Sequence, residues 1–222
     1  MDRSEVYARF QKDTAEHAMT VLRDDGLYRH LRFQKPGTWC YGFDIVTWPG
    51  YLAITGDMGA SLFARTADMI EFFRPERGAE PSDELFINPP YWSEKLQANG
   101  GETREFREDL FRATIKEHFD DFVSSHQADG AERPAWAADL WRELEDQVIS
   151  EAVEYRSMTL ALKAMQDFQP EKGSPYERYT FEDVGEYASS LQGYTFHFTW
   201  RLYAIAHAVQ VYDAAKAQAV PA

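Results

Sequence analysis

A stretch of short strand-like segments separated by tight turns, residues 30–74, constrains the fold of this chain more than any other part of its sequence. β-Branched and aromatic residues come there in short runs, which are bounded by Pro-Gly at 49–50 and by Gly-Asp-Met-Gly at 56–59. Apolar runs bounded by such turn residues are typical of antiparallel strands joined as hairpins. The pattern therefore predicts an antiparallel meander that leads into a helix beginning at Asp68.

The two segments on either side of residues 49–50 separate a core face from an outer face. Because strand side chains point alternately to opposite faces, the core face should carry Phe43, Ile45, Leu52 and Ile54. The outer face should carry a mixed aromatic and polar set, Asp44, Val46, Trp48, Tyr51, Ala53 and Thr55. Helices of the same protein could cover that face, or it could bind a ligand. Since Pro-Gly suits a type II turn and tight hairpins prefer mirror-image turns, we expect a longer loop or a bulge at residues 49–50.

The segments outside the meander predict helices. Apolar residues recur at helical spacing over residues 4–23, with Ser4 as the N-cap, and similar stripes recur between residues 103 and 168. Residues 193–212 are apolar or aromatic on nearly all sides, which is typical of a helix buried in the middle of a domain. Residues 75–104 are rich in Pro and Gly, and a connection of this length is usually functional or mobile.

These elements predict an α+β fold in a single domain spanning residues 1–222. The sheet should be small and antiparallel, with about three or four strands near the N-terminus, and about six helices should cover one of its faces. We expect the C-terminal helix to be buried at the centre against the meander, with the acidic helices outside it.

The chain is strongly acidic, with 37 Asp and Glu residues against 23 Lys and Arg residues and a net charge of −14. Such a field repels the phosphates of nucleic acids and anionic membranes, so direct binding to either is disfavoured and a basic protein surface is the favoured partner. Residues 102–154 hold 15 acidic and 6 basic residues, a net charge of −9. This concentration indicates either the solvated face of amphipathic helices or a binding surface for a basic partner. The candidate partner-binding residues are Glu117, Asp120, Asp121, Asp139, Glu143, Glu145 and Asp146.

The sequence holds no recognisable catalytic, metal or cofactor motif, so we predict no catalytic residue, no metal and no cofactor. His197 and His207 are ten residues apart on one predicted helix, about 15 Å along its axis, and cannot share an ion. His118 has at most one carboxylate nearby. The single cysteine, Cys40, excludes an internal disulfide and lies in no nucleophile motif. Asn-Pro-Pro-Tyr at 88–91 occurs in DNA amino-methyltransferases, but the glycine-rich turn of such enzymes is missing here.

An alternative function is a small-ligand or nucleotide-binding protein, or an enzyme, with its pocket on the polar face of the meander. His30 and Arg32 lie two apart on a predicted strand and therefore point to the same face. An arginine with an aspartate nearby can hold an anion or simply form a structural ion pair. The candidate ligand-binding residues are His30, Arg32, Asp44, Trp48, Asp57 and Arg74.

Four segments, residues 30–33, 43–59, 68–74 and 196–213, together resemble an uncharacterised family of small proteins carried by tailed phages, prophages and related bacterial mobile elements. The resemblance runs in order over most of the chain. It implies a setting, that of an accessory phage protein, and carries no site residue. Accessory phage proteins of this size often bind and disable a host or defence component. Acidic helices would suit that role, as a mimic of nucleic acid or as an electrostatic lure for a basic protein surface.

The leading hypothesis is therefore a phage or prophage accessory protein that acts by binding. It would inhibit a host defence or nucleic-acid-handling protein through the acidic helical surface around residues 102–154. We expect the basic surface of a host protein as the partner, no direct nucleic-acid contact and no membrane contact, and the sequence leaves homo-oligomers open. Since the N-terminal residues lack the pattern of a signal peptide, we expect the protein in the host cell cytoplasm.

Overall fold

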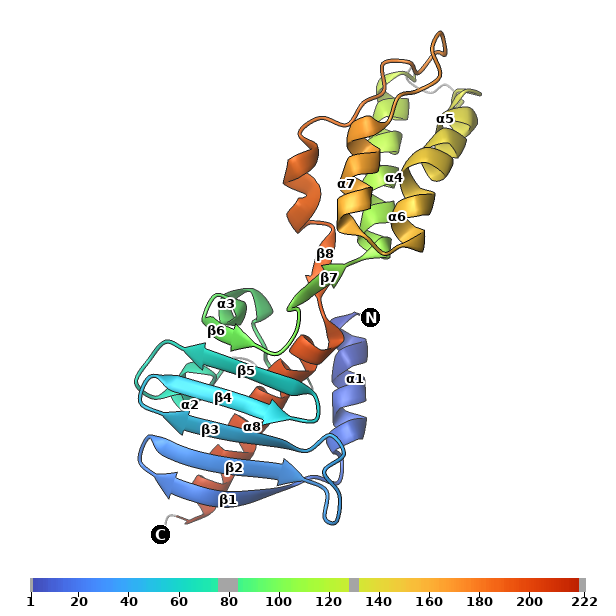
Figure 1. The fold of residues 1–222 in the computed structure, drawn as a ribbon. Coiled ribbons are helices and arrows are strands. Elements are labelled where there is room, and N and C mark those ends of the chain that lie inside the picture. The colour runs from blue at the N-terminus through green and yellow to red at the C-terminus, as the bar shows by residue number, and fades with distance from the viewer. Residues whose placement is uncertain (1, 76–83, 128–131, 220–222) are drawn as a thin grey trace. The chain divides into compact units, whose positions relative to one another are not determined.

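The computed structural model describes residues 2–75, 84–127 and 132–219, and the chain divides into two compact units (Figure 1). The first, called here the sheet unit, consists of Met1–Thr103 and Tyr194–Ala222. The second, the helical unit, consists of Arg104–Gly193. The prediction of one domain over residues 1–222 stays a prediction, because it concerns whether the two units unfold together.

The sheet unit contains an antiparallel sheet of six strands whose order in space follows the chain. The strands are β1 (Ala18–Asp25), β2 (Tyr28–Gln34), β3 (Phe43–Trp48), β4 (Tyr51–Gly56), β5 (Gly59–Ala64) and β6 (Leu96–Asn99). The α+β class is thus confirmed, whereas the expected number of strands was too small. The two edge strands were missed, since β1 lies in the segment predicted as helix and β6 lies in the Pro- and Gly-rich connection. Pairing with a neighbouring strand, which only the folded chain supplies, outweighs local propensity at both edges.

The register of β3 and β4 confirms the predicted core face. Phe43, Ile45, Leu52 and Ile54 are all buried. Trp48 pairs directly with Tyr51, so residues 49–50 form a two-residue turn and the expected longer loop or bulge is wrong. Gly50 makes this turn possible because it adopts a φ of +87°, which costs a residue without a Cβ very little.

The helices of the sheet unit pack on the core face. They are α1 (Arg3–Thr14), α2 (Met69–Phe72), α3 (Pro89–Ser93) and α8 (Phe196–Ala219). Figure 1 shows α8 crossing behind the strands, and its buried aromatic residues confirm the expected C-terminal helix. The first helix is capped by Asp2, in a capping box with Glu5, and not by Ser4 as predicted. Within the described residues, no helix combines the length and apolar character needed to cross a membrane.

Arg201 of α8 is only 1% exposed and joins this helix to the sheet through hydrogen bonds. Its guanidinium donates hydrogen bonds to Ser61 Oγ (2.9 Å), the Met58 carbonyl (2.6 Å) and Asn99 Oδ1 (2.9 Å). Among the described residues it pairs with no carboxylate, and burial lowers the pKa of the Arg201 guanidinium. The neighbouring Gly59 has to be a glycine, because a Cβ there would lie 2.6 Å from Arg201 Nη1.

The helical unit has a hydrophobic core of its own. Its elements are β7 (Arg104–Phe106), α4 (Glu108–Ser125), α5 (Ala137–Leu144), the π-helical turn η1 (Glu145–Ile149), α6 (Ser150–Glu154), α7 (Met158–Asp167), the 3₁₀ helix η2 (Val184–Ser189) and β8 (Gln192–Tyr194). Strands β7 and β8 pair where the chain enters and leaves the unit. The apolar stripes of α4 to α7 therefore pack against one another in the core of this unit. In the sheet unit, the described helices that pack on the sheet are α1, α2, α3 and α8, and the expectation of about six helices on one face stays a prediction.

Candidate functional site

The outer face of the sheet holds a compact cluster of three predicted site residues. Asp44 accepts hydrogen bonds from Arg32 Nε and Nη2, both at 2.9 Å, and its Oδ2 lies 2.9 Å from His30 Nε2. Burial alone would raise the pKa of Asp44, but the hydrogen bonds from Arg32 and His30 hold it below its ordinary value. Both carboxylate oxygens of Asp44 are therefore occupied from within the protein.

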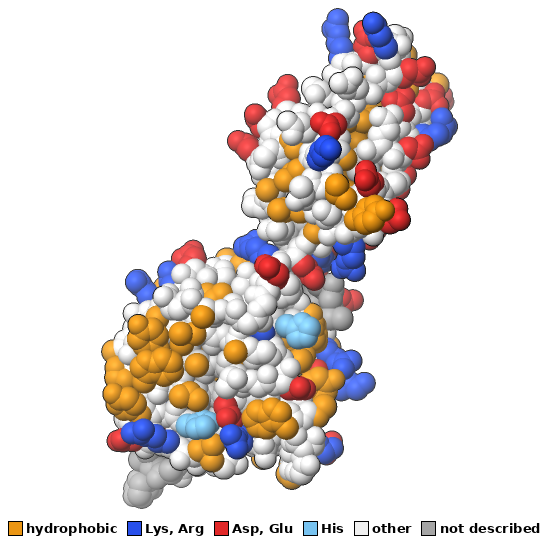
Figure 2. Space-filling view, viewed as in Figure 1, with side chains coloured by type: hydrophobic (Ala, Val, Ile, Leu, Met, Phe, Trp, Pro, Cys, Tyr) orange, Lys and Arg blue, Asp and Glu red, His pale blue; other side chains and the backbone are white. Residues whose placement is uncertain are grey.

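Aromatic side chains flank this cluster. Trp39, 41% exposed, lies over the Arg32 guanidinium at 5.3 Å, and Trp48 stacks on the exposed Tyr51 with ring centroids 5.2 Å apart. In Figure 2, orange side chains gather over the end of the sheet where β3 turns into β4. The helices of the sheet unit lie on the other face, so this face is open within the part of the unit that the structure describes.

The remaining two predicted ligand-binding residues lie apart from the cluster. Asp57, in the turn between β4 and β5, accepts a hydrogen bond from the backbone N–H of Tyr41 at 2.9 Å. Arg74 forms a two-point ion pair with Asp213 at 2.7 and 2.8 Å. The structure thus groups His30, Arg32 and Asp44 and gives Asp57 and Arg74 separate structural contacts.

Four of the seven acidic residues predicted to bind a partner are engaged within the helical unit. Asp120 pairs with Lys116 and, at 3.1 Å, with Arg133. Further contacts are Asp139 with Arg142 (2.9 Å), Glu145 with Arg112 (2.7 Å) and Glu143 with the hydroxyl of Tyr176 (2.7 Å). Glu117, Asp121 and Asp146 form no ion pair with any residue that the structure describes. The predicted surface is therefore partly neutralised by the protein itself.

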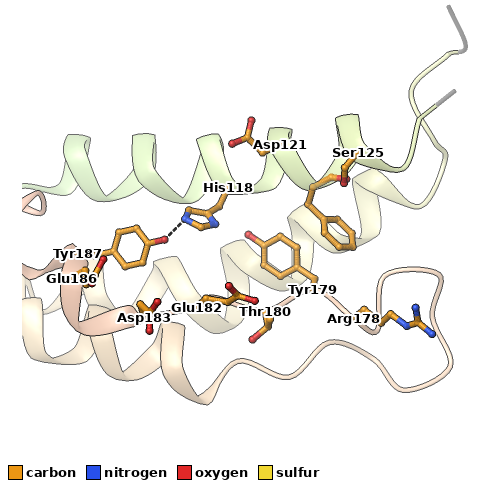
Figure 3. Close-up of a pocket in the computed structure, with 11 residues that line it drawn as sticks. His118, Asp121, Ser125, Arg178, Tyr179, Thr180, Glu182, Asp183, Glu186 and Tyr187 are labelled. Carbon is orange, nitrogen blue, oxygen red and sulfur yellow. Dashed lines mark hydrogen bonds between the residues drawn. The ribbon is translucent and has the colours of Figure 1, made fainter. Parts of the chain in front are cut away.

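Asp121, one of the unpaired acids of α4, lines a groove between this helix and residues 178–187 (Figure 3). The groove encloses about 750 Å³. Its lining residues are His118, Asp121, Phe122, Ser125, Arg178, Tyr179, Thr180, Glu182, Asp183, Glu186 and Tyr187. Residues at spacings of three and four along α4 fall on one helical face, which is why His118, Asp121, Phe122 and Ser125 line the groove together.

Aromatic contacts form the inner wall of the groove. Figure 3 shows His118 pointing from α4 toward Tyr187, whose hydroxyl is hydrogen-bonded to His118 Nε2. His118 also packs on Phe181 with ring centroids 5.5 Å apart. Tyr179 contacts Phe122 at 5.0 Å in an edge-to-face arrangement. These rings hold the two sides of the groove at a fixed separation.

Negative charge gathers at the end of the groove that holds Tyr187. Burial is the largest cause that raises the pKa of Tyr187, and the carboxylates of Asp183, Glu186, Glu182 and Glu117 raise it further. In the described part of the chain none of these four carboxylates forms an ion pair. Asp183 adopts a left-handed backbone with φ of +46°, which is uncommon outside glycine. In Figure 3, Arg178 lies at the opposite end of the groove.

Tyr179 contributes an unsatisfied polar atom to this wall. The residue is 3% exposed, and its buried hydroxyl has no hydrogen-bond partner among the residues that the structure describes. Burial strongly raises the pKa of this phenol. In Figure 3 the hydroxyl points into the space between α4 and residues 182–187. Since buried hydroxyl groups are normally hydrogen-bonded, this atom marks a place where a donor or acceptor from outside could be accommodated.

Of the eleven described residues that line the groove, only Asp121 was predicted from the sequence as a site residue. Asp121 was predicted, whereas Glu182, Asp183, Glu186 and the two tyrosines were not, because they are about sixty residues further along the chain. A charge count over the whole helical unit would have drawn attention to them, since Arg104–Gly193 holds 20 acidic and 10 basic residues. Tertiary packing places these residues beside α4, and no local sequence pattern predicts that position.

Comparison of the chain with models of protein families, with curated proteins and with solved structures gave no match. In the described residues, no three His, Cys, Asp or Glu side chains come together as metal ligands. The candidate site therefore rests on the geometry and charge of this chain.

Proposed function

We propose that the protein acts by binding, and that the helical unit presents an acidic surface to the basic surface of a partner protein. One observation carries this proposal: within the part of the chain that the structure describes, no ion pair engages the acids around the groove, Glu117, Asp121, Glu182, Asp183 and Glu186. The helical unit has a net charge of −10, against −4 for the sheet unit. Complementary charge of this kind speeds association and selects partners of opposite sign.

The resemblance to phage and prophage proteins supplies the setting of this proposal. In that setting the partner is a host defence or nucleic-acid-handling protein, because such proteins carry the basic surfaces that normally meet phosphates. The acidic surface would occupy that basic surface as a mimic of nucleic acid and so inhibit the host protein in the host cytoplasm. The repulsion between this unit and phosphates is consistent with a protein partner and not with direct nucleic-acid binding.

The alternative, a small-ligand site on the outer face of the sheet, has weaker support. Arg32 and His30 both bond to Asp44, so the positive charge that would hold an anion is already offset by a carboxylate. The exposed stack of Trp48 and Tyr51 is the one feature of this face that favours a ligand or partner. This alternative predicts that His30→Ala or Asp44→Ala abolishes an activity while partner binding is kept.

The proposed function is tested by affinity capture of host proteins on the tagged full chain, at low and at high salt. We expect a basic protein that is captured at low salt and released at high salt, because exposed charges are screened by salt. The double variant Glu117→Lys with Asp121→Lys reverses two exposed, unpaired charges on α4 and should abolish capture. A matched control is Glu151→Lys with Glu154→Lys, which reverses two exposed charges on α6, away from the groove.

Two results would contradict the proposal. One is a partner whose capture does not depend on salt. The other is a partner that the α4 variant captures as well as the unmodified chain does, while circular dichroism shows both proteins folded.

A further inference from the structure

We propose that the groove of the helical unit holds an arginine side chain from a basic segment of the partner. This inference rests on the proposed function, and it names the group that the acidic surface recognises. It follows from three properties of the groove taken together: an aromatic wall, unpaired carboxylates at one end, and a buried hydroxyl without a partner.

The aromatic wall suits a planar cation. Phe122, Tyr179 and Tyr187 line the groove, and the rings of Phe122 and Tyr179 are held edge to face at 5.0 Å. A guanidinium stacks on aromatic rings and is less strongly hydrated than an ammonium group, so it loses less when it enters such a groove. The wall therefore favours arginine over lysine.

The carboxylates lie where the end of such a side chain would reach. Asp183 and Glu186 are exposed, and together with Glu182 and Glu117 they are close enough to Tyr187 to raise the pKa of its phenol. A guanidinium donates several N–H groups and can bond two carboxylate oxygens at once. Within the described residues these acids do not converge as metal ligands, so an organic cation fits the site better than a metal ion does.

The hydroxyl of Tyr179 provides a separate reason to expect a ligand. It is buried, points into the groove and has no hydrogen-bond partner in the described part of the chain. An N–H of a bound guanidinium could donate to this oxygen after a small rotation of the ring. A bound arginine would then satisfy an atom that the free protein leaves unsatisfied.

The same helix already holds an arginine of its own chain in this way. Arg133 lies over the ring of Phe119 at 4.9 Å and pairs with Asp120 at 3.1 Å. Phe122 and Asp121 are the corresponding aromatic and acidic side chains next to them along α4. Both are among the residues that line the groove. Arg178 lies at the far end of the groove (Figure 3), and no described residue forms an ion pair with the acids at the other end.

The test is a titration of the full chain with a tetra-arginine peptide, followed by calorimetry and by NMR of the aromatic side chains. We expect the resonances of His118, Tyr179 and Tyr187 to shift. The variant Asp183→Asn with Glu186→Gln should weaken binding by about tenfold or more, since each charge-assisted hydrogen bond that is lost contributes a large part of the binding free energy. Asparagine suits position 183 because it tolerates the left-handed backbone that Asp183 adopts.

Two further variants separate the groove from charge in general. Glu151→Gln with Glu154→Gln removes the same number of charges from α6 and should leave the affinity within about twofold, because exposed charges at a distance contribute little. Tyr179→Phe removes only the unpartnered hydroxyl and so should keep the fold. We expect it to weaken tetra-arginine binding several-fold, about the effect of one hydrogen bond.

The inference is overturned if tetra-arginine does not bind, if both pairs of charge variants weaken it equally, or if tetra-lysine or spermine binds more tightly. These results leave the proposed function to be decided by capture of a host partner. If a salt-sensitive partner is captured but tetra-arginine does not bind, only the arginine assignment is wrong. A partner insensitive to salt would mean that the proposed function itself is wrong.

Discussion

The sheet unit and the helical unit use charged residues in opposite ways. In the sheet unit, arginines are paired internally: Arg29 bonds Asp68 through two contacts, Arg32 bonds Asp44, and Arg74 bonds Asp213. In the helical unit several acids around one groove form no ion pair with any described residue, and the net charge is −10. The difference shows that an acidic composition alone does not identify a binding surface, because what matters is which charges the fold leaves unpaired.

The largest effect is expected from the buried arginine of the sheet unit. Arg201→Ala would remove three hydrogen bonds and leave Ser61 and Asn99 without this partner, with a cavity beside them. We expect a loss of about 4 kcal/mol in the free energy of unfolding, as for other buried polar networks that are broken. Chemical denaturation measures this loss. A change below about 1 kcal/mol would mean that the network is not needed.

The second effect tests whether the two cores are independent. Leu140 is fully buried in the core of the helical unit, and Leu140→Ala should cost about 3 kcal/mol. If the units unfold separately, tryptophan fluorescence and amide hydrogen exchange should show a loss of protection confined to Arg104–Gly193. An equal loss in the sheet unit would instead support the predicted single domain.

A smaller effect should appear in the sheet unit on acidification. Burial lowers the pKa of His207, which packs between Phe10 and Phe33, and the nearby His17 lowers it further. Burial also lowers the pKa of His17, against the opposing influence of the Cys40 carbonyl and of Asp13. The unfolded chain therefore binds protons first as the pH falls, and stability should decrease from about pH 6.5 down to the folded pKa values.

Thermal unfolding as a function of pH measures this decrease. The variant His207→Gln is the control, because it removes the more buried of the two titrating groups and should flatten the pH dependence in this range. A dependence of the same steepness in the variant would assign the effect to other residues.

The smallest effect is expected on the outer face of the sheet. Arg32 is partly exposed, and Arg32→Ala should reduce stability only slightly because solvent screens its pair with Asp44. The same variant should leave capture of a basic partner unchanged. Loss of capture would show that the partner binds the sheet unit and not the helical unit.

Much of the sheet unit could be predicted because its signals are local. The period of two in residues 43–46 and 51–54 assigned the core face correctly, and Asp68 was correctly identified as the start of a helix. The continuation of the first helix to residue 23 was wrong, since Val21 and Leu22 fit a helical stripe equally well. Only the presence of β2 beside them makes a strand the better choice.

The candidate site was predictable only in part. Three of the acids, Glu117, Asp121 and Asp146, form no ion pair within the described residues, whereas Asp120, Asp139, Glu143 and Glu145 contact groups of the same unit. Whether the three bind a partner stays a prediction. The acidic character of the helical unit and the alternation of the meander could be read from the sequence, because composition and side-chain period are properties of the chain. Tertiary structure alone decided which acids are neutralised and brought Tyr179 and Tyr187 to α4, because ion pairing and burial depend on distances between residues far apart in sequence.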